Sequence, residues 1–141
     1  MVEDRLVPIN PADVAKISGL VSPFISAASR KGPLPLDVSA VLKLCGESLH
    51  QLWVVKNRTD EIVAAAVTGI CTDPDGRRVC EWISAAGDNP ASWIGFSEQI
   101  EEWAREHGCA AMRSFSRPAM GRVLPKSYRV KGVIFEKGLG Q

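Results

Sequence analysis

The stretch that decides the fold is "ISAAGDNPASWIGF", Ile83 to Phe96, which runs from an apolar strand through a polar turn into a helix. Asn89 is a typical helix N-cap residue, and Pro90 suits the first helical position because the missing N–H is not needed there. The helix that starts here is predicted to end at Gly108. Its apolar residues recur at helical spacing and form one stripe: Trp93, Phe96, Ile100, Trp103 and Ala104.

Three strand-like segments precede this helix. They are "HQLWVVKN" (50–57), "EIVAAAVTGICT" (61–72) and "RRVCEWISAAG" (77–87). The middle segment is apolar throughout, which is typical of a strand buried on both faces. The turns "NRTDE" and "DPDG" join the segments, and their Asn, Asp, Pro and Gly residues favour tight reversals. The sequence therefore predicts an antiparallel meander.

Helices and strands are also predicted on either side of this centre. A first helix follows Asn10, with Pro23 expected to end or kink it, and a second follows Asp37 and stops at Gly46. Downstream we expect a strand at 109–117, a short helix at 118–128 and a last strand at 130–139. This order predicts an α+β (mixed α/β) fold, with a mostly antiparallel sheet covered by helices on both faces. No linker divides the chain, so 1–141 is predicted to be a single domain.

Composition excludes several classes of function. The net charge of +1 and the pI of about 7.7 give no bulk attraction to nucleic acid or to an anionic membrane. No apolar run approaches the roughly 18 residues of a membrane span, and the acidic N-terminus does not resemble a secretory signal. We therefore expect a cytoplasmic protein. The four cysteines and two histidines lack metal-ligand spacing, so no metal site is predicted.

The order of elements resembles that of the GCN5-related N-acetyltransferase (GNAT) fold. The segments that carry the likeness are "LWVVKN", "EIVAAAVTGI", "IEEWAREHGCAAM" and "SRPAMGRVLPKSYRVKGVIFEKGL". The last of these resembles, more specifically, small GNAT-like proteins of tailed bacteriophages and prophages. The positions that match that pattern are Arg117, Met120, Arg122, Leu124, Tyr128 and Lys137.

The resemblance implies where acetyl-CoA would bind. In GNAT enzymes the pyrophosphate lies on a glycine-rich turn at the start of the central helix, where free N–H groups and the helix dipole favour negative charge. By position, Gly87, Asn89, Ala91 and Ser92 would form that turn here. However, Asp88 adds a negative charge and Pro90 removes a donor. The same residues also suit a helix that simply caps itself.

The resemblance also implies a general acid and a general base. GNAT enzymes often use a Tyr in the short helix as the acid, and here Leu124 takes that place while Tyr128 takes that of a Phe. A Glu on the fourth strand often serves as the base, and Glu81 is the local candidate. The alternative is that Glu81 points to solvent from a half-exposed strand.

The region from 113 to 131 is basic and contains no acidic residue. Its cations are Arg113, Arg117, Arg122, Lys126, Arg129 and Lys131. Such a region suits a phosphate-bearing ligand, a nucleic acid or an acidic protein surface. The alternative is a solvated face that balances the acidic helix at 98–106.

Three functional hypotheses follow. The leading one is a phage or prophage protein that keeps the GNAT fold with a degenerate acetyl-CoA site, binds no cofactor, and has a binding or virion-assembly role. Its partners would be other phage proteins or a second copy of itself, in the host cytoplasm or the virion. The alternative is an active N-acyltransferase that uses acetyl-CoA, with Glu81 as base. The third is nucleic-acid binding through the basic 113–131 region.

Overall fold

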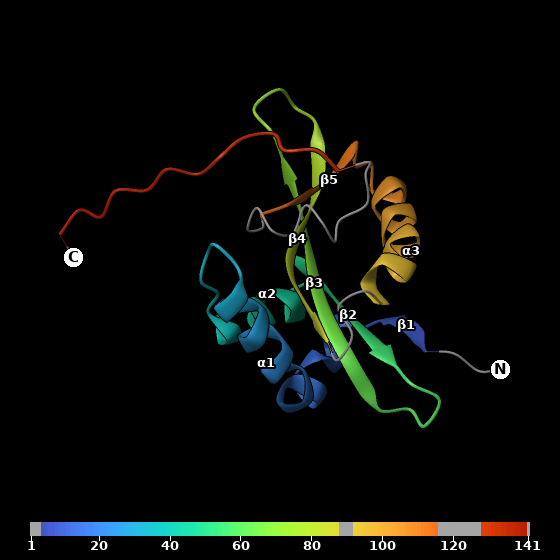
Figure 1. Ribbon diagram of the computed structural model, residues 1–141. Helices are drawn as coiled ribbons and strands as arrows, with labels where there is room; N and C mark the ends of the chain where they lie inside the picture. Colours follow the sequence, from blue (N-terminus) through green and yellow to red (C-terminus); the bar gives the residue numbers. More distant parts are fainter. Residues whose placement is uncertain (1–3, 88–91, 116–127, 141) are drawn as a thin grey trace.

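The computed structural model describes residues 4–87, 92–115 and 128–140 (Figure 1). The chain begins with strand β1 (Arg5–Pro8), a 3-10 turn η1 (Pro11–Asp13) and helices α1 (Val14–Lys31) and α2 (Val38–Gly46). Strands β2 (His50–Lys56), β3 (Ile62–Thr72) and β4 (Arg78–Gly87) follow. Helix α3 (Ser92–Glu106) and strand β5 (Ala111–Ser114) complete the described elements.

The strands form one sheet in the order β1-β2-β3-β4-β5. The first three pairs are antiparallel, and only β4 and β5 run parallel. The predicted meander and the predicted mostly antiparallel α+β fold are therefore confirmed. Strand β1 was not predicted from the sequence, and its four residues pair with the second half of β2.

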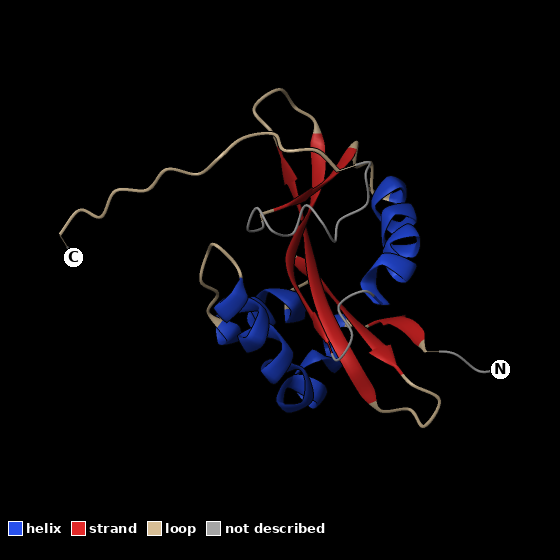
Figure 2. Cartoon of the chain, in the orientation of Figure 1, coloured by secondary structure: helices blue, strands red, loops and turns tan. Residues whose placement is uncertain are grey.

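Helices cover both faces of the sheet, with α1 and α2 on one side and α3 on the other (Figure 2). Strand β2 supplies both cores because its side chains alternate: Leu52 and Val54 pack with α1 and α2, while Trp53 and Val55 lie on the α3 side. On that side, Trp53 meets Trp103 edge to face at 5.4 Å between ring centroids. The run of buried apolar residues in 52–55 is the result of this two-sided burial.

Asp37 caps α2 as predicted, whereas Asn10 caps the 3-10 turn η1, which runs directly into α1 at Val14. The Asn10 side chain accepts a hydrogen bond from the backbone N–H of Ala12, and the Asp37 side chain accepts one from that of Ala40. Pro23 was predicted to end or kink the first helix. It does not end the helix, because α1 continues to Lys31. Pro23 lies on the exposed side of α1, where water can reach the carbonyl that its missing N–H leaves unpaired.

The end of the chain differs from the prediction. The strand expected at 109–117 is present as β5, but the last strand expected at 130–139 is not formed. A strand needs a neighbour for its N–H and C=O groups, and no described strand lies beside this segment. The short helix expected at 118–128 lies almost wholly outside the described residues. Across the described ranges, no helix combines the length and apolar character that a bilayer span requires.

Candidate functional site

Strand β5 pairs with only the first part of strand β4. Their pairing runs from Val79 opposite Ala111 to Trp82 opposite Ser114, whereas β4 itself continues to Gly87. Directly after the last pair, β4 contains a bulge: Thr68 of β3 faces Trp82 and Val67 faces Ser84, so Ile83 has no partner on β3. A bulge bends its strand and increases its twist. Beyond Trp82, β4 has no partner on the β5 side among the described strands, and we call the place where this pairing ends the opening between β4 and β5.

Glu81 lies beside this opening, directly opposite Arg113 of β5. Its carboxylate Oε1 accepts a hydrogen bond from the thiol of Cys71 at 3.3 Å and lies 3.7 Å from a guanidinium nitrogen of Arg113. The Glu81 side chain keeps 22% of its surface exposed. The site therefore holds a partly exposed carboxylate with two partners that were not foreseen, and the role of Glu81 as a base stays a prediction.

Arg113 is bound more tightly by Asp73 than by Glu81. Its two terminal nitrogens donate to the two Asp73 carboxylate oxygens at 2.9 and 2.8 Å. This bond and the charge of Arg113 hold the pKa of Asp73 below its ordinary value, and the pKa of Arg113 is raised in return. Burial, followed by the hydrogen bond to Glu81, raises the pKa of the Cys71 thiol. Cys71 is therefore a hydrogen-bond donor to Glu81 at neutral pH rather than a thiolate nucleophile.

Tyr128 approaches the same opening from the α3 side. The indole N–H of Trp82 donates to the Tyr128 hydroxyl oxygen at 3.0 Å, and Trp82 itself packs in the α3-side core. Burial raises the pKa of the Tyr128 hydroxyl, which keeps it protonated at neutral pH. Since the hydroxyl oxygen is the acceptor here, its own proton is not used in this bond. From the sequence, Tyr128 was assigned to the place of a Phe rather than to that of the general acid, and its contact with Trp82 was not foreseen.

The predicted cofactor turn is described only at its two ends. Gly87 is the last residue of β4, and Ser92 is the first of α3. Asn89 and Ala91 lie outside the described residues. A Cβ atom on Gly87 would lie 2.5 Å from that of Ala64, its partner on β3, so close strand pairing requires glycine here. The glycine thus has a packing role that is independent of any ligand.

The predicted basic region is only partly described. Arg129 and Lys131 are exposed, whereas the charge of Arg113 is met by Asp73. The remaining three members, Arg117, Arg122 and Lys126, lie outside the described residues. A nucleic-acid surface therefore stays a prediction.

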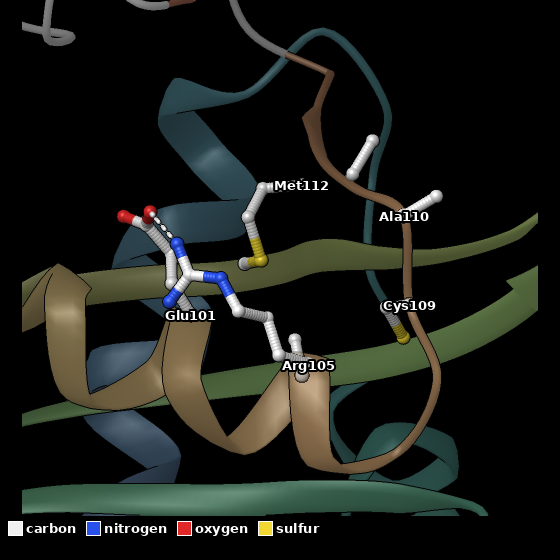
Figure 3. A pocket seen from close by; sticks show the side chains of 7 residues that line it. Glu101, Arg105, Cys109, Ala110 and Met112 are labelled. Carbon is white, nitrogen blue, oxygen red and sulfur yellow. Dashed lines mark ion pairs between the residues drawn. The ribbon is translucent and has the colours of Figure 1, made fainter.

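A separate pocket lies between α3 and β5, on the face opposite Glu81 (Figure 3). Arg105 and Glu101 form an ion pair at its wall, with 3.9 Å between nitrogen and oxygen. The sulfur atoms of Cys109 and Met112 face it from the other side. Nowhere in 4–87, 92–115 and 128–140 do three or more His, Cys, Asp or Glu side chains gather as metal ligands.

Known proteins resemble this chain in structure rather than in sequence. No protein-family model and no curated protein sequence matches it. An aminoglycoside acetyltransferase from an uncultured soil metagenomic sample superposes with a TM-score of 0.72 at 12% identity, over 97% of this chain and 99% of that one. A Trypanosoma brucei acetyltransferase gives 0.65 at 16% identity, over 97% and 100%.

Two further solved structures extend the likeness. A GNAT family acetyltransferase from Staphylococcus aureus has a TM-score of 0.65 at 13% identity, over 97% of this chain and 99% of that one. A predicted acetyltransferase from Clostridium acetobutylicum, solved with acetyl-CoA, has a TM-score of 0.67 at 12% identity, over 96% of each chain. At these identities the likeness establishes the fold, and the fold of this chain is that of the GNAT acetyltransferases.

Proposed function

We propose that this protein is an acyl-CoA-dependent N-acyltransferase whose reaction takes place in the opening between β4 and β5. The observation that carries the proposal is that a carboxylate and a phenol flank this opening. Glu81 lies on one side, within 3.3 Å of the Cys71 thiol, and Tyr128 on the other, 3.0 Å from the Trp82 indole nitrogen. The fold shared with acetyltransferases, one of them solved with acetyl-CoA, supports the same cofactor here.

The two side chains suit the two proton transfers of the reaction. When an amine attacks the acyl carbonyl carbon of a thioester, a C–N bond forms and the C–S bond breaks. The amine must lose a proton, which the Glu81 carboxylate can accept directly or through a water molecule. The departing sulfur must gain a proton, which the Tyr128 hydroxyl can donate. Arg113 and Cys71 hold the Glu81 carboxylate in place on its strand.

A second candidate function is binding without catalysis, in a protein that keeps the fold and has lost acetyl transfer. Gly87 favours it, because the one glycine at the predicted phosphate turn already serves strand pairing with Ala64. Asp88 and Pro90 add a repelling charge and remove a donor from the same turn. The phage origin and the virion-assembly role rest on the sequence resemblance alone.

Thermal unfolding with acetyl-CoA separates the two functions. A ligand present at about 100 times its Kd stabilises the folded state by about 2.7 kcal/mol, which is readily seen as a rise in Tm. The enzyme proposal predicts this rise with acetyl-CoA, and none with an equal concentration of ATP as a control for general anion binding. An unchanged Tm at millimolar acetyl-CoA would contradict the enzyme proposal and favour the binding role.

A further inference from the structure

The C-terminal segment leaves the domain with its apolar side chains exposed. From 129 to 140 the chain has no helix or strand and ends far from the sheet (Figure 1; Figure 2). The exposed fraction is 87% for Val130, 72% for Val133, 91% for Phe135 and 83% for Leu139. Scattered single apolar residues are ordinary on a surface, but a contiguous group marks an interaction site.

The composition of this segment is that of a strand. "VIF", Val133 to Phe135, consists of β-branched and aromatic residues, and no proline interrupts 130–139. In a strand, Val133 and Phe135 would face one side of a sheet while Ile134 faced the other. Such a strand buries apolar side chains on both faces, as the inner strands of this sheet do.

The sheet offers one edge that suits a further strand. β5 is the outermost strand on its side in the described part of the chain, and it contains no proline. Just past its end, Phe115 is 43% exposed. The opposite edge, β1, is protected by Pro8 and by the ion pair of Arg5 with Asp60, devices that block strand addition.

We propose that the segment 130–139 of one copy forms a strand beside β5 of a second copy, so that two chains exchange C-terminal arms. Tyr128, hydrogen-bonded to Trp82, anchors the base of the arm on its own domain, and the arm then runs outward instead of along its own β5 (Figure 1). Reciprocal exchange closes a two-fold dimer and gives the apolar residues of the arm a sheet on which to pack. This inference does not depend on the proposed enzymatic function.

Mass measurement by light scattering on the full-length protein is the first test. The proposal predicts a dimer, twice the chain mass of 15.3 kDa. Phe135→Asp places a charge in the arm interface and is expected to yield a monomer that still unfolds in one cooperative transition, because the exposed Phe135 side chain makes no contact with the core of its own domain. Leu20→Asp, at a 61% exposed position on α1, is the matched control and should stay dimeric. A monomeric wild-type protein, or a dimer indifferent to Phe135→Asp, would overturn the proposal.

A cross-linking experiment identifies what the arm touches. A photoreactive phenylalanine analogue at 135 is placed in the full-length chain, and 14N- and 15N-labelled chains are mixed and allowed to exchange. Cross-links from 135 to the peptide containing β5 should then join light and heavy chains. If those cross-links join only chains of the same label, the arm pairs with its own β5, and the exchange is refuted.

Discussion

Arg113 of β5 extends across β4 and donates two hydrogen bonds, of 2.9 and 2.8 Å, to the carboxylate of Asp73, the residue that follows β3. The pair ties the two strands on either side of β4 to each other, next to the carboxylate of Glu81. It therefore contributes to the sheet and to the candidate site at once.

Asp73→Asn tests the structural part of this role. The folded-state pKa of Asp73 lies below its ordinary value of 3.8, so its stabilisation is complete above that value and is lost as the pH falls through the lowered pKa. We expect the variant to be less stable than the wild type at pH 7 and to lose less stability between pH 5 and pH 2. Urea unfolding across this range measures both. Asp75→Asn, at an exposed position in the same turn, should follow the wild-type pH dependence.

Glu81→Gln and Tyr128→Phe test the catalytic part. If these side chains move protons in the reaction, each substitution should lower kcat by about a hundredfold or more while the rise in Tm with acetyl-CoA persists. Steady-state acetyl transfer to an amine acceptor gives the rates, with the exposed Glu98→Gln as control. Retention of full kcat in both variants would place the acid and the base elsewhere.

Gly87→Ala tests the close approach of β4 and β3. A methyl group there would lie 2.5 Å from the Ala64 Cβ atom, so the strands must separate, at a cost of about 1–3 kcal/mol in the free energy of unfolding. Gly95→Ala is the matched control, because no atom lies within 4 Å of its added methyl on helix α3. That change should stabilise the protein by up to about 1 kcal/mol. Equal effects of the two changes would contradict the packing role of Gly87.

Thr68→Val tests the hydrogen bond in the α3-side core. Thr68 is fully buried, and its hydroxyl oxygen accepts from the Trp53 indole nitrogen at 3.0 Å. Valine keeps the shape but leaves that buried N–H without its partner, which costs about 1–3 kcal/mol. Chemical denaturation followed by tryptophan fluorescence reports the change. Thr68→Ser keeps the hydroxyl, so it should retain the bond and lose only the packing of one methyl group.

The centre of the fold was predictable because local patterns and tertiary packing agree there. The turn at 73–76 and the caps at Asn10 and Asp37 each act within a few residues, and the structure confirms them. The strand at the C-terminus was predicted wrongly for the opposite reason. Its apolar pattern is genuine, but a strand also needs a neighbour, and sequence periodicity carries no information about which chain supplies one.

The candidate site was predictable only in part. Glu81 was singled out by its place on the fourth strand, but its contacts with Cys71 and Arg113 join residues from three different strands. Tyr128 was assigned to the place of a Phe, and its contact with Trp82 was not foreseen because Trp82 lies 46 residues away in the sequence. Contacts of this kind depend on strand register. A single bulge moves every later side chain of its strand to the face opposite the one that simple alternation predicts.

Deletion of one residue would be enough to remove that bulge from β4. Ile83 is the extra residue of the bulge, and the residues of β3 opposite it alternate between the two faces without interruption. A chain without Ile83 could therefore keep Glu81 and Trp82 on the faces of the sheet where they now lie. What it would lose is the local bend and extra twist that the bulge gives β4 just past its last pair with β5. The direction in which the second half of β4 leaves the β5 edge therefore depends on one inserted residue.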